Sequence, residues 1–187
     1  MATTDKRDPR VVRTHNDVPA VALRLLLDEG WEAVTPVRVA TEAGYSRATI
    51  YTHWPERIDL LRDAFAQFSE MPHHEASGDA ELDLRGELAS FSRAMVEHRL
   101  DRALATLAER TQTNPEIAPI RNTFVADGER PMRHTLRALA EDPAAEAALL
   151  MLTGMVTHSV LMHGTPPSDE VLDAAVDIVM RGLAQRD

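Results

Sequence analysis

The chain has no cysteine among its 187 residues, which excludes disulfide bonds and thiolate metal sites. Aromatic residues make up only 4% of it, and no segment alternates polar and apolar residues over the length of a β-strand. The N-terminal residues MATTDKRDPRVVR are charged and lack the apolar core of a secretory signal. We therefore expect an all-α protein that works in the cytoplasm.

Motifs of catalysis and metal binding are also missing. The sequence contains no Gly-rich phosphate loop, nucleophile elbow or paired-acid site, and no HExxH spacing. His73 and His74 are adjacent in a loop, a poor geometry for one chelate, and His158 and His163 are five residues apart, which separates them on an α-helix. We expect neither an enzyme nor a metal or other cofactor.

Basic residues are scarce, and lysine almost absent, yet their distribution is informative. The net charge is −10, but residues 1–62 contain nine basic and nine acidic side chains, against 11 and 21 in the remainder. Lys6, Arg7, Arg10, Arg13 and His15 fall within the first fifteen residues. This segment is either an ordinary solvated tail or a basic arm that approaches phosphates.

The stretch Thr35–Trp54 predicts two short helices joined by a tight turn. Thr35 is a side-chain N-cap, followed by Pro36 at the first helical position, where a missing N–H has no cost. Gly44 supplies the backbone freedom that a sharp corner needs. The inner side of the first helix would consist of Val37, Val39, Ala40 and Ala43.

The second helix of this stretch is expected over Arg47–His53, with Ser46 as its N-cap. Ile50 and Trp54, spaced i and i+4, would face the core. The outward side would then carry hydrogen-bonding groups and one arginine, which suits a DNA major groove. Its members are Arg47, Ala48, Thr49, Tyr51, Thr52 and His53.

Apolar periodicity and capping residues predict further helices on both sides. One runs from about Asn16 to Glu29, ended by Gly30 in the left-handed conformation. Another starts at Pro55–Arg57 and ends near Glu70, and Met71–Asp79 connects two domains. The later helices cover Leu82–Leu100, Asp101–Arg110, a segment from Asn114 to Leu139 that Gly128 and Pro131 break or kink, one from Asp142–Pro143, and one from Ser168 to about Leu183.

Residues Ala147–His163 contain no charged side chain other than histidine. A membrane span needs about 20 predominantly apolar residues, and this shorter run includes Thr153, Gly154 and Thr157, so we expect no membrane insertion. An all-round apolar helix pair instead favours a homodimer through a four-helix interface, with a crowded monomer core as the alternative. The predicted interface comprises Leu149, Leu152, Val156, Val160, Val171, Ala175, Ile178 and Val179.

A ligand pocket among the later helices is a further expectation. Such pockets are lined mainly by apolar side chains with a few polar groups, and methionine makes an adaptable lining. A lipophilic neutral or cationic compound fits this composition, although ordinary core packing explains the same residues. The candidates are Phe91, Met95, His98, Leu104, Leu107, Phe124, Met151, Met155 and His158.

Over Val18–Ala64 the sequence closely resembles the TetR/AcrR family of bacterial transcriptional repressors. The resemblance is carried by Gly30–Trp31–Glu32–Ala33–Val34–Thr35, by the run from Val39 to Tyr51, and by His53–Trp54. Trp54 replaces a more usual Phe and Ile58 a common Glu. The C-terminal part is similar more loosely, through the number and lengths of its helices.

The resemblance implies a homodimer that represses transcription from a palindromic operator and is released by a small molecule. It implies an N-terminal arm and DNA-binding domain over 1–62 and a helical ligand-binding and dimerisation domain over 63–187. Arg57 stands where the family usually has a lysine that touches phosphate. The expected DNA-binding set is Thr35, Ser46, Arg47, Ala48, Thr49, Tyr51, Thr52, His53 and Arg57.

One alternative from another class stays open. A helical binding or assembly protein could keep this fold without reading an operator. Tight, palindrome-specific and steeply salt-dependent binding would distinguish the repressor, whereas the alternative would bind DNA weakly and without sequence preference.

Overall fold

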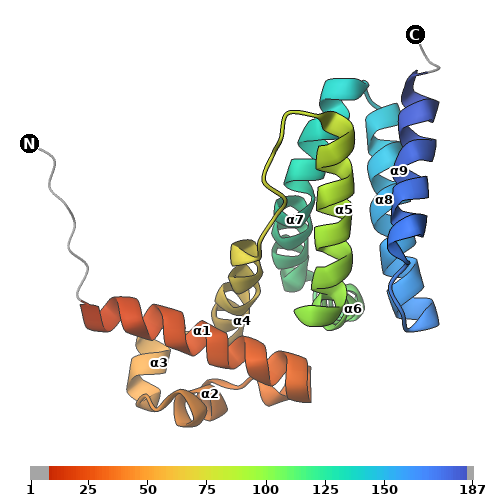
Figure 1. Ribbon diagram of the computed structural model, residues 1–187. Helices are drawn as coiled ribbons and strands as arrows, with labels where there is room; N and C mark the ends of the chain where they lie inside the picture. Colours follow the sequence, from red (N-terminus) through yellow and green to blue (C-terminus); the bar gives the residue numbers. More distant parts are fainter. Residues whose placement is uncertain (1–8, 185–187) are drawn as a thin grey trace, which may run out of the picture. The chain divides into compact units, whose positions relative to one another are not determined.

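Helices form all the regular secondary structure in residues 9–184, the part of the chain that the computed structural model describes (Figure 1). The expected all-α fold is confirmed. Lys6 and Arg7 of the predicted basic arm lie outside the described residues. The chain divides into two compact units: the first comprises residues 9–70 with Thr106–Arg121, and the second comprises Met71–Ala105 with residues 122–184. A domain boundary after residue 62 stays a prediction.

The first unit is built around a long N-terminal helix. α1 (Pro9–Glu29) packs against α2 (Pro36–Ala43) and α4 (Arg57–Ala66), and α2 packs against α3 (Arg47–His53). Two short 3-10 segments, η1 (Trp31–Ala33) and η2 (Gln67–Glu70), precede α2 and follow α4. The core contains some of the largest fully buried side chains of the chain: Leu25, Ile50, Trp54, Leu60 and Leu61.

Three predictions about this unit need correction. α1 begins at Pro9 rather than near Asn16, because a proline is tolerated in the first turn, where its missing N–H leaves no bond unmade. Gly30 has a positive φ of 90° but an extended ψ of −179°, so it is not the left-handed C-cap that we expected. Val37 is exposed, and the inner side of α2 is formed by Val39 and Ala40.

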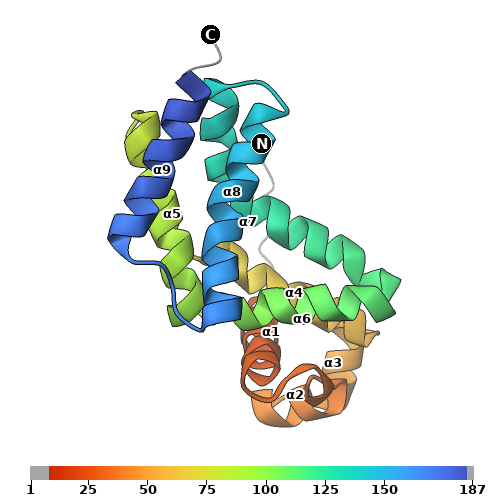
Figure 2. The same ribbon diagram turned by 90° about the vertical axis from the view of Figure 1, so that its right-hand side faces the viewer.

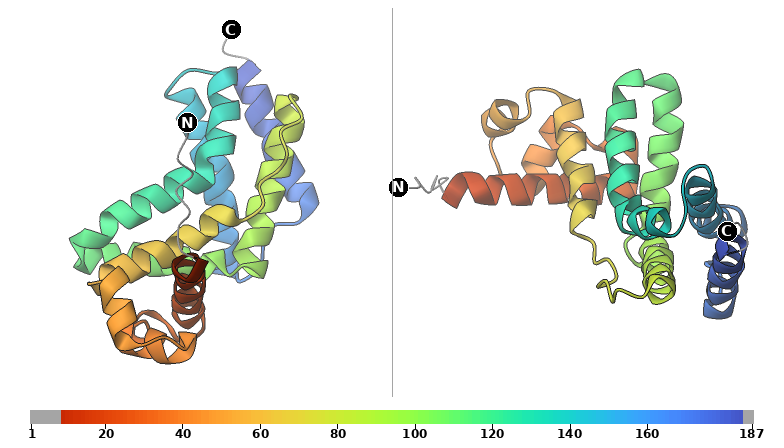
Figure 3. Two further views of the ribbon diagram at one scale, coloured as in Figure 1. Left: turned by 90° about the vertical axis from the view of Figure 1, so that its left-hand side faces the viewer. Right: turned by 90° about the horizontal axis from the view of Figure 1, so that it is seen from above.

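The second unit consists mainly of long helices. α5 (Ala80–Glu97) packs against both α8 (Ala144–His158) and α9 (Asp169–Ala184), as Figures 1 and 3 show. α6 (Leu100–Thr113), η3 (Pro115–Ile117) and α7 (Ala118–Leu139) lie between α5 and α8 in sequence. α7 remains one helix through Gly128 and Pro131 instead of breaking there, and it is drawn bent in Figure 2.

The connection Met71–Asp79 contains no helix and is firmly attached to α5 by two carboxylates. Asp83 accepts hydrogen bonds from the backbone N–H and the hydroxyl of Ser77, each at 2.7 Å. Glu87 accepts one from the backbone N–H of His74 at 2.8 Å and lies 3.0 Å from Nδ1 of His73. Asp83 and Glu87 are both buried, so the connector covers two charged groups that α5 places beside its apolar face.

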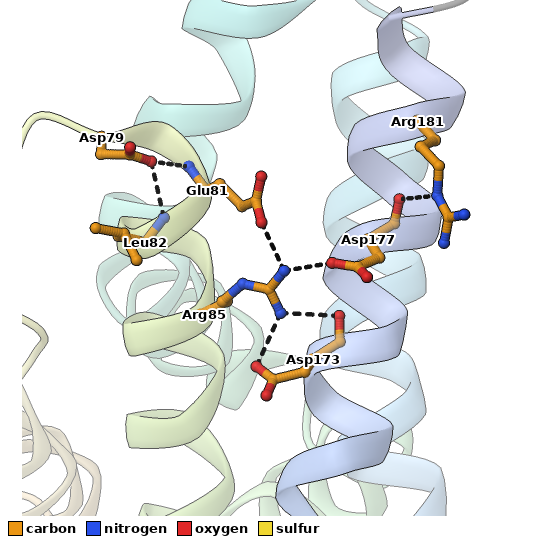
Figure 4. A network of polar contacts seen from close by, with 7 residues as sticks. All are labelled: Asp79, Glu81, Leu82, Arg85, Asp173, Asp177 and Arg181. Carbon is orange, nitrogen blue, oxygen red and sulfur yellow. Dashed lines mark hydrogen bonds and ion pairs between the residues drawn. The ribbon is translucent and has the colours of Figure 1, made fainter.

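An arginine on α5 holds the last helix. Arg85 donates from Nη1 to a carboxylate oxygen of Asp173 at 2.9 Å and from Nη2 to Glu81 at 2.6 Å. It also bonds to Asp177, so its guanidinium joins two carboxylates of α9 to one of α5 (Figure 4). These hydrogen bonds raise the pKa of Arg85 and keep it charged.

α8 continues into η4 (Ser159–His163), which is a π-helical turn. Ala144–His163 is long and apolar enough to cross a membrane by length and composition alone, but a core helix of a soluble protein passes the same test. Its inner side, which includes Leu149, Leu152 and Val156, is buried within the chain. Leu150 and Met162 are 59% and 66% exposed, so an apolar outer side has no cover among the described residues.

Candidate nucleic-acid interface

The predicted two-helix stretch is present with the expected caps. The hydroxyl of Thr35 accepts from the backbone N–H of Arg38 at 3.2 Å, and that of Ser46 accepts from Thr49 at 3.1 Å. Gly44 adopts the left-handed conformation, with φ 74° and ψ 25°. The turn between α2 and α3 is thus fixed by short-range interactions that the sequence itself specifies.

α3 presents one side to the core and another to solvent. Ile50 and Trp54 are almost completely buried. The indole N–H of Trp54 donates to Asp63 at 2.7 Å, which ties the end of α3 to α4. The opposite side is uncovered or partly covered, and it carries six of the predicted DNA-binding residues: Arg47, Ala48, Thr49, Tyr51, Thr52 and His53.

Not all of these polar groups are equally available. The hydroxyl of Thr52 donates to the carbonyl of Ala48 at 2.8 Å, which leaves it as an acceptor toward a ligand. Thr49 shares a 2.8 Å hydrogen bond with the Ser46 hydroxyl, so its methyl group is the part free for apolar contact. Arg47 and Tyr51 are exposed, and they are the long side chains on this surface.

Two ion pairs and one hydrogen bond fix this surface on α1. Arg24 bonds to Glu42 at 3.0 Å, and Arg38 bonds to Glu29 at 2.6 Å. Near the turn, the hydroxyl of Tyr45 donates to Asp17 at 2.8 Å. Exposed pairs of this kind contribute little stability individually, but together they set the direction of α2 and of the turn that leads to α3.

His53 belongs to a small aromatic cluster that sequence reasoning did not find. Its ring centroid lies 4.9 Å from that of His15 on α1 and 5.7 Å from that of Trp54. The His15 ring is also 5.0 Å from Trp54. His15 and His53 therefore meet at the last turn of α3, although they are 38 positions apart in the sequence.

Arg57 makes contacts within the first unit that the sequence did not indicate. Its guanidinium donates to the carbonyl of Trp31, lies 4.9 Å above that indole ring, and is 3.7 Å from Glu32. Arg110 of α6 lies 5.5 Å from the same ring and 3.3 Å from Glu32. Burial lowers the pKa of Arg57, the charge of Glu32 opposes this, and that of Arg110 adds to it.

The nine ligand-pocket candidates do not share one environment. Met95 and Leu107 are fully buried, whereas Phe91, Leu104, Phe124 and Met155 are partly covered. Leu107 lies in the part of α6 that belongs to the first unit. His98, Met151 and His158 are exposed, so within the described chain these three do not lie in its interior.

The predicted dimer residues also separate into two groups. Leu149, Leu152, Val156, Val160 and Val179 are buried in the chain's own core and are not available to another copy. Val171 and Ile178 are exposed, and Ala175 is partly covered. An all-round apolar helix gives no sequence signal for which side faces inward, so reasoning from sequence also missed three exposed side chains: Leu150, Leu161 and Met162.

Comparison with known proteins identifies the family. Residues 20–64 match the family described as bacterial regulatory proteins, tetR family, and residues 74–179 match the tetracyclin repressor-like C-terminal domain. The chain belongs to the TetR family. The helix-turn-helix regulator fold predicted from the sequence is thereby confirmed.

Individual relatives agree with this assignment. The uncharacterized HTH-type transcriptional regulator Rv1556 of Mycobacterium tuberculosis is 26% identical over 171 residues, which cover 86% of this chain and 83% of that one. A TetR-family regulator from Mesorhizobium loti has the same fold, with a TM-score of 0.72 at 14% identity, over 95% of this chain and 98% of the other. A regulator from Saccharomonospora viridis, solved in complex with choline, gives a TM-score of 0.65 at 18% identity, over 91% and 96%.

In this TetR-family chain, α2 and α3 are the helix-turn-helix, and α1 and α4 are the helices that hold it. The tetracyclin repressor-like match covers residues 74–179, which belong to the second unit except for Thr106–Arg121. The family and its named relatives are described as transcriptional regulators rather than enzymes.

Proposed function

We propose that this protein is a ligand-responsive transcriptional repressor of the cytoplasm, which binds a palindromic operator as a homodimer and is released by a small lipophilic effector. The observation that carries the proposal is the uncovered polar side of α3, held rigidly by Ile50 and Trp54 in a chain of the TetR family. A side of this kind, on a short helix after a tight turn, matches the way helix-turn-helix proteins enter the major groove.

Each exposed group of α3 has a role that follows from its chemistry. Arg47 is the side chain that we propose reads a base, because a guanidinium can donate to guanine O6 and N7 together. Ala48 and the methyl group of Thr49 suit thymine methyl groups. Tyr51, Thr52 and His53 suit phosphate or sugar contacts, which fix position without reading sequence. Thr35 and Ser46 remain proposed contacts at the two helix starts.

Arg57 has a more limited role in this proposal. One side of its guanidinium is held by the carbonyl of Trp31, and part of the side chain stays exposed. We propose that Arg57 orders the loop before α2 and that its exposed edge approaches a phosphate. It then supports the reading surface chiefly through position, unlike a freely mobile lysine.

The second copy is proposed to cover the outer side of α8 and α9. Leu150, Met162 and Ile178 are each more than half exposed, and monomers seldom leave large contiguous apolar patches open to water. A two-fold arrangement covers the same patch on both copies at once. Within the original set, Val171, Ala175 and Ile178 stay in the proposed interface, joined by Leu150, Leu161 and Met162.

The effector is proposed to bind within the second unit, among α5 and the helices that pack on it. Phe91 and Met95 of α5 and Met155 of α8 are candidates that are buried or partly covered and lie on adjacent helices. Residues 63–187 carry 21 acidic and 11 basic side chains, which favours a neutral or cationic compound. The choline complex of the Saccharomonospora viridis regulator is consistent with a cation.

Operator selection from genomic fragments tests the function as a whole. We expect enrichment of a palindrome and binding that weakens steeply with salt, because each phosphate contact releases counterions. A compound panel then tests release from the selected site. Weak binding without sequence preference would contradict the proposal and favour the non-operator alternative.

Arg47→Ala is the sharpest single test of α3. We expect weaker operator binding by about 1–3 kcal/mol per lost contact, and relaxed preference at the corresponding base pair. Arg93→Ala removes an exposed arginine from α5, outside the first unit, and serves as the matched control. Unchanged affinity and unchanged base preference in a gel-shift assay would remove Arg47 from the reading set.

A further inference from the structure

The π-helical turn η4 brings together two histidines that an α-helix would separate. Five residues span about 500° in an α-helix at 3.6 residues per turn, which would leave His158 and His163 on different sides. The wider turn at Ser159–His163 changes this spacing, and the ring centroids lie only 5.3 Å apart at an interplanar angle of 73°. π-helical turns are rare in proteins, and those that do occur often lie at functional sites.

Both rings are uncovered in the single chain. His158 and His163 are exposed, and within the described residues neither ring nitrogen makes a hydrogen bond or an ion pair. This differs from His73 and His74, which face the carboxylates of Glu87 and Asp83. The π turn is itself well anchored, since the Ser159 hydroxyl donates to the carbonyl of Thr165 at 2.8 Å.

The ring separation agrees with that of two imidazoles on one metal ion. A Zn²⁺–N distance of about 2.0–2.1 Å places each ring centroid roughly 3.2 Å from the metal, and a tetrahedral angle then separates the centroids by roughly 5.2 Å. The observed value is 5.3 Å. The same distance also suits an edge-to-face ring contact, so the experiment must distinguish chelation from packing.

We propose that His158 and His163 together chelate a divalent transition-metal cation of the imidazole-preferring kind, such as Zn²⁺, Ni²⁺ or Cu²⁺. The two side chains supply two ligands, and the exposed position leaves the remaining coordination sites to other groups. Chelation by this pair fixes the π turn and hence the start of the loop that leads to α9. The site lies in the second unit and does not depend on the proposed operator binding.

The test is metal titration of the full, untagged chain with Zn²⁺ or Ni²⁺, followed by calorimetry and thermal unfolding. We compare His158→Gln, His163→Gln and the double variant, with His134→Gln on α7 as a control that removes one exposed histidine. Because chelation needs both rings, each single variant should lose at least about tenfold in affinity and the double variant little more. Metal should raise the unfolding temperature of the parent and the control only.

Other outcomes would overturn the proposal. Losses that add between the two single variants indicate independent surface histidines, and an equal loss in His134→Gln indicates nonspecific binding. Absence of saturable binding at pH 7.5 would also overturn it.

Discussion

Asp83 is a buried carboxylate whose charge is stabilised by the connector. The hydroxyl and backbone N–H of Ser77 lower the pKa of Asp83 most, with smaller contributions from the backbone of Gly78 and the charge of His74, while burial opposes the shift. A carboxylate with a lowered pKa in the folded state stabilises the fold above its unfolded pKa of about 3.9. That stabilisation is lost as the pH falls through the folded value.

Asp83→Asn should therefore destabilise the protein at neutral pH and much less in acid. The amide keeps one acceptor oxygen but loses the charge and the second acceptor. We expect the difference in free energy of unfolding between parent and variant to shrink as the pH falls below about 4. Chemical denaturation over a pH series measures it, with Glu75→Gln in the exposed part of the connector as the control. A difference independent of pH would contradict the assigned cause.

The attachment of the connector to α5 depends on Gly86 as well as on the carboxylates. A Cβ atom at Gly86 would lie 2.2 Å from Nδ1 of His74, so the imidazole occupies the space that any other residue would need. Glycine in a helix interior otherwise costs roughly 0.5–1 kcal/mol relative to alanine. The close approach of the connector to α5 therefore explains why a glycine stands at this helix position.

Gly86→Ala should have opposite effects in two backgrounds. In the parent chain it should destabilise the protein, because His74 must leave its place beside α5. In a His74→Ala background it should stabilise by up to about 1 kcal/mol, since only the helix propensity remains. Thermal unfolding of all four chains measures the coupling. A stabilising effect in both backgrounds would show that His74 moves aside without cost.

The sequence predicts elements well where their determinants are local. Thr35, Gly44 and Ser46 specify caps and a turn within a few residues, and all three have the expected conformation. The π turn could not be predicted, because an i,i+5 pair matches no ordinary helical period. The sequence also did not indicate which side of α8 is buried, because apolar residues occur all around this helix.

Longer-range contacts explain the other differences in the candidate site. Arg57 reaches a carbonyl 26 residues earlier in the chain, and Asp83 meets a serine in a segment without regular structure. Neither pairing has a periodic signature. Sequence reasoning therefore named Arg57 as a phosphate contact without its partner, and it did not identify Asp83 or Glu87 at all.

The whole molecule has an uneven distribution of exposed apolar residues. Several of the largest lie on α8, η4 and α9: Leu150, Met151, Met162 and Ile178 are each more than half exposed. Helical DNA readers that recognise two half-sites need a second copy at a fixed spacing. The same face is thus the proposed determinant of both oligomeric state and operator geometry.

Ile178→Asp should convert the protein toward a monomer. A carboxylate in the proposed interface would be desolvated against the second copy, at a cost on the order of several kcal/mol per dimer. Light scattering on a sizing column measures the mass, and gel shift should show a parallel loss of operator affinity. Leu82→Asp is the control, because Leu82 is 55% exposed on α5. A dimeric Ile178→Asp protein would place the interface elsewhere.

Trp31 lies close to the guanidinium groups of both Arg57 and Arg110, and the chain has one other tryptophan, Trp54. Both belong to the first unit, as do both tyrosines, Tyr45 and Tyr51. Tryptophan and tyrosine fluorescence therefore originates from the helix-turn-helix unit. Changes in this emission during titration with DNA or a small molecule report on that unit without an attached dye, because the second unit contains neither tryptophan nor tyrosine.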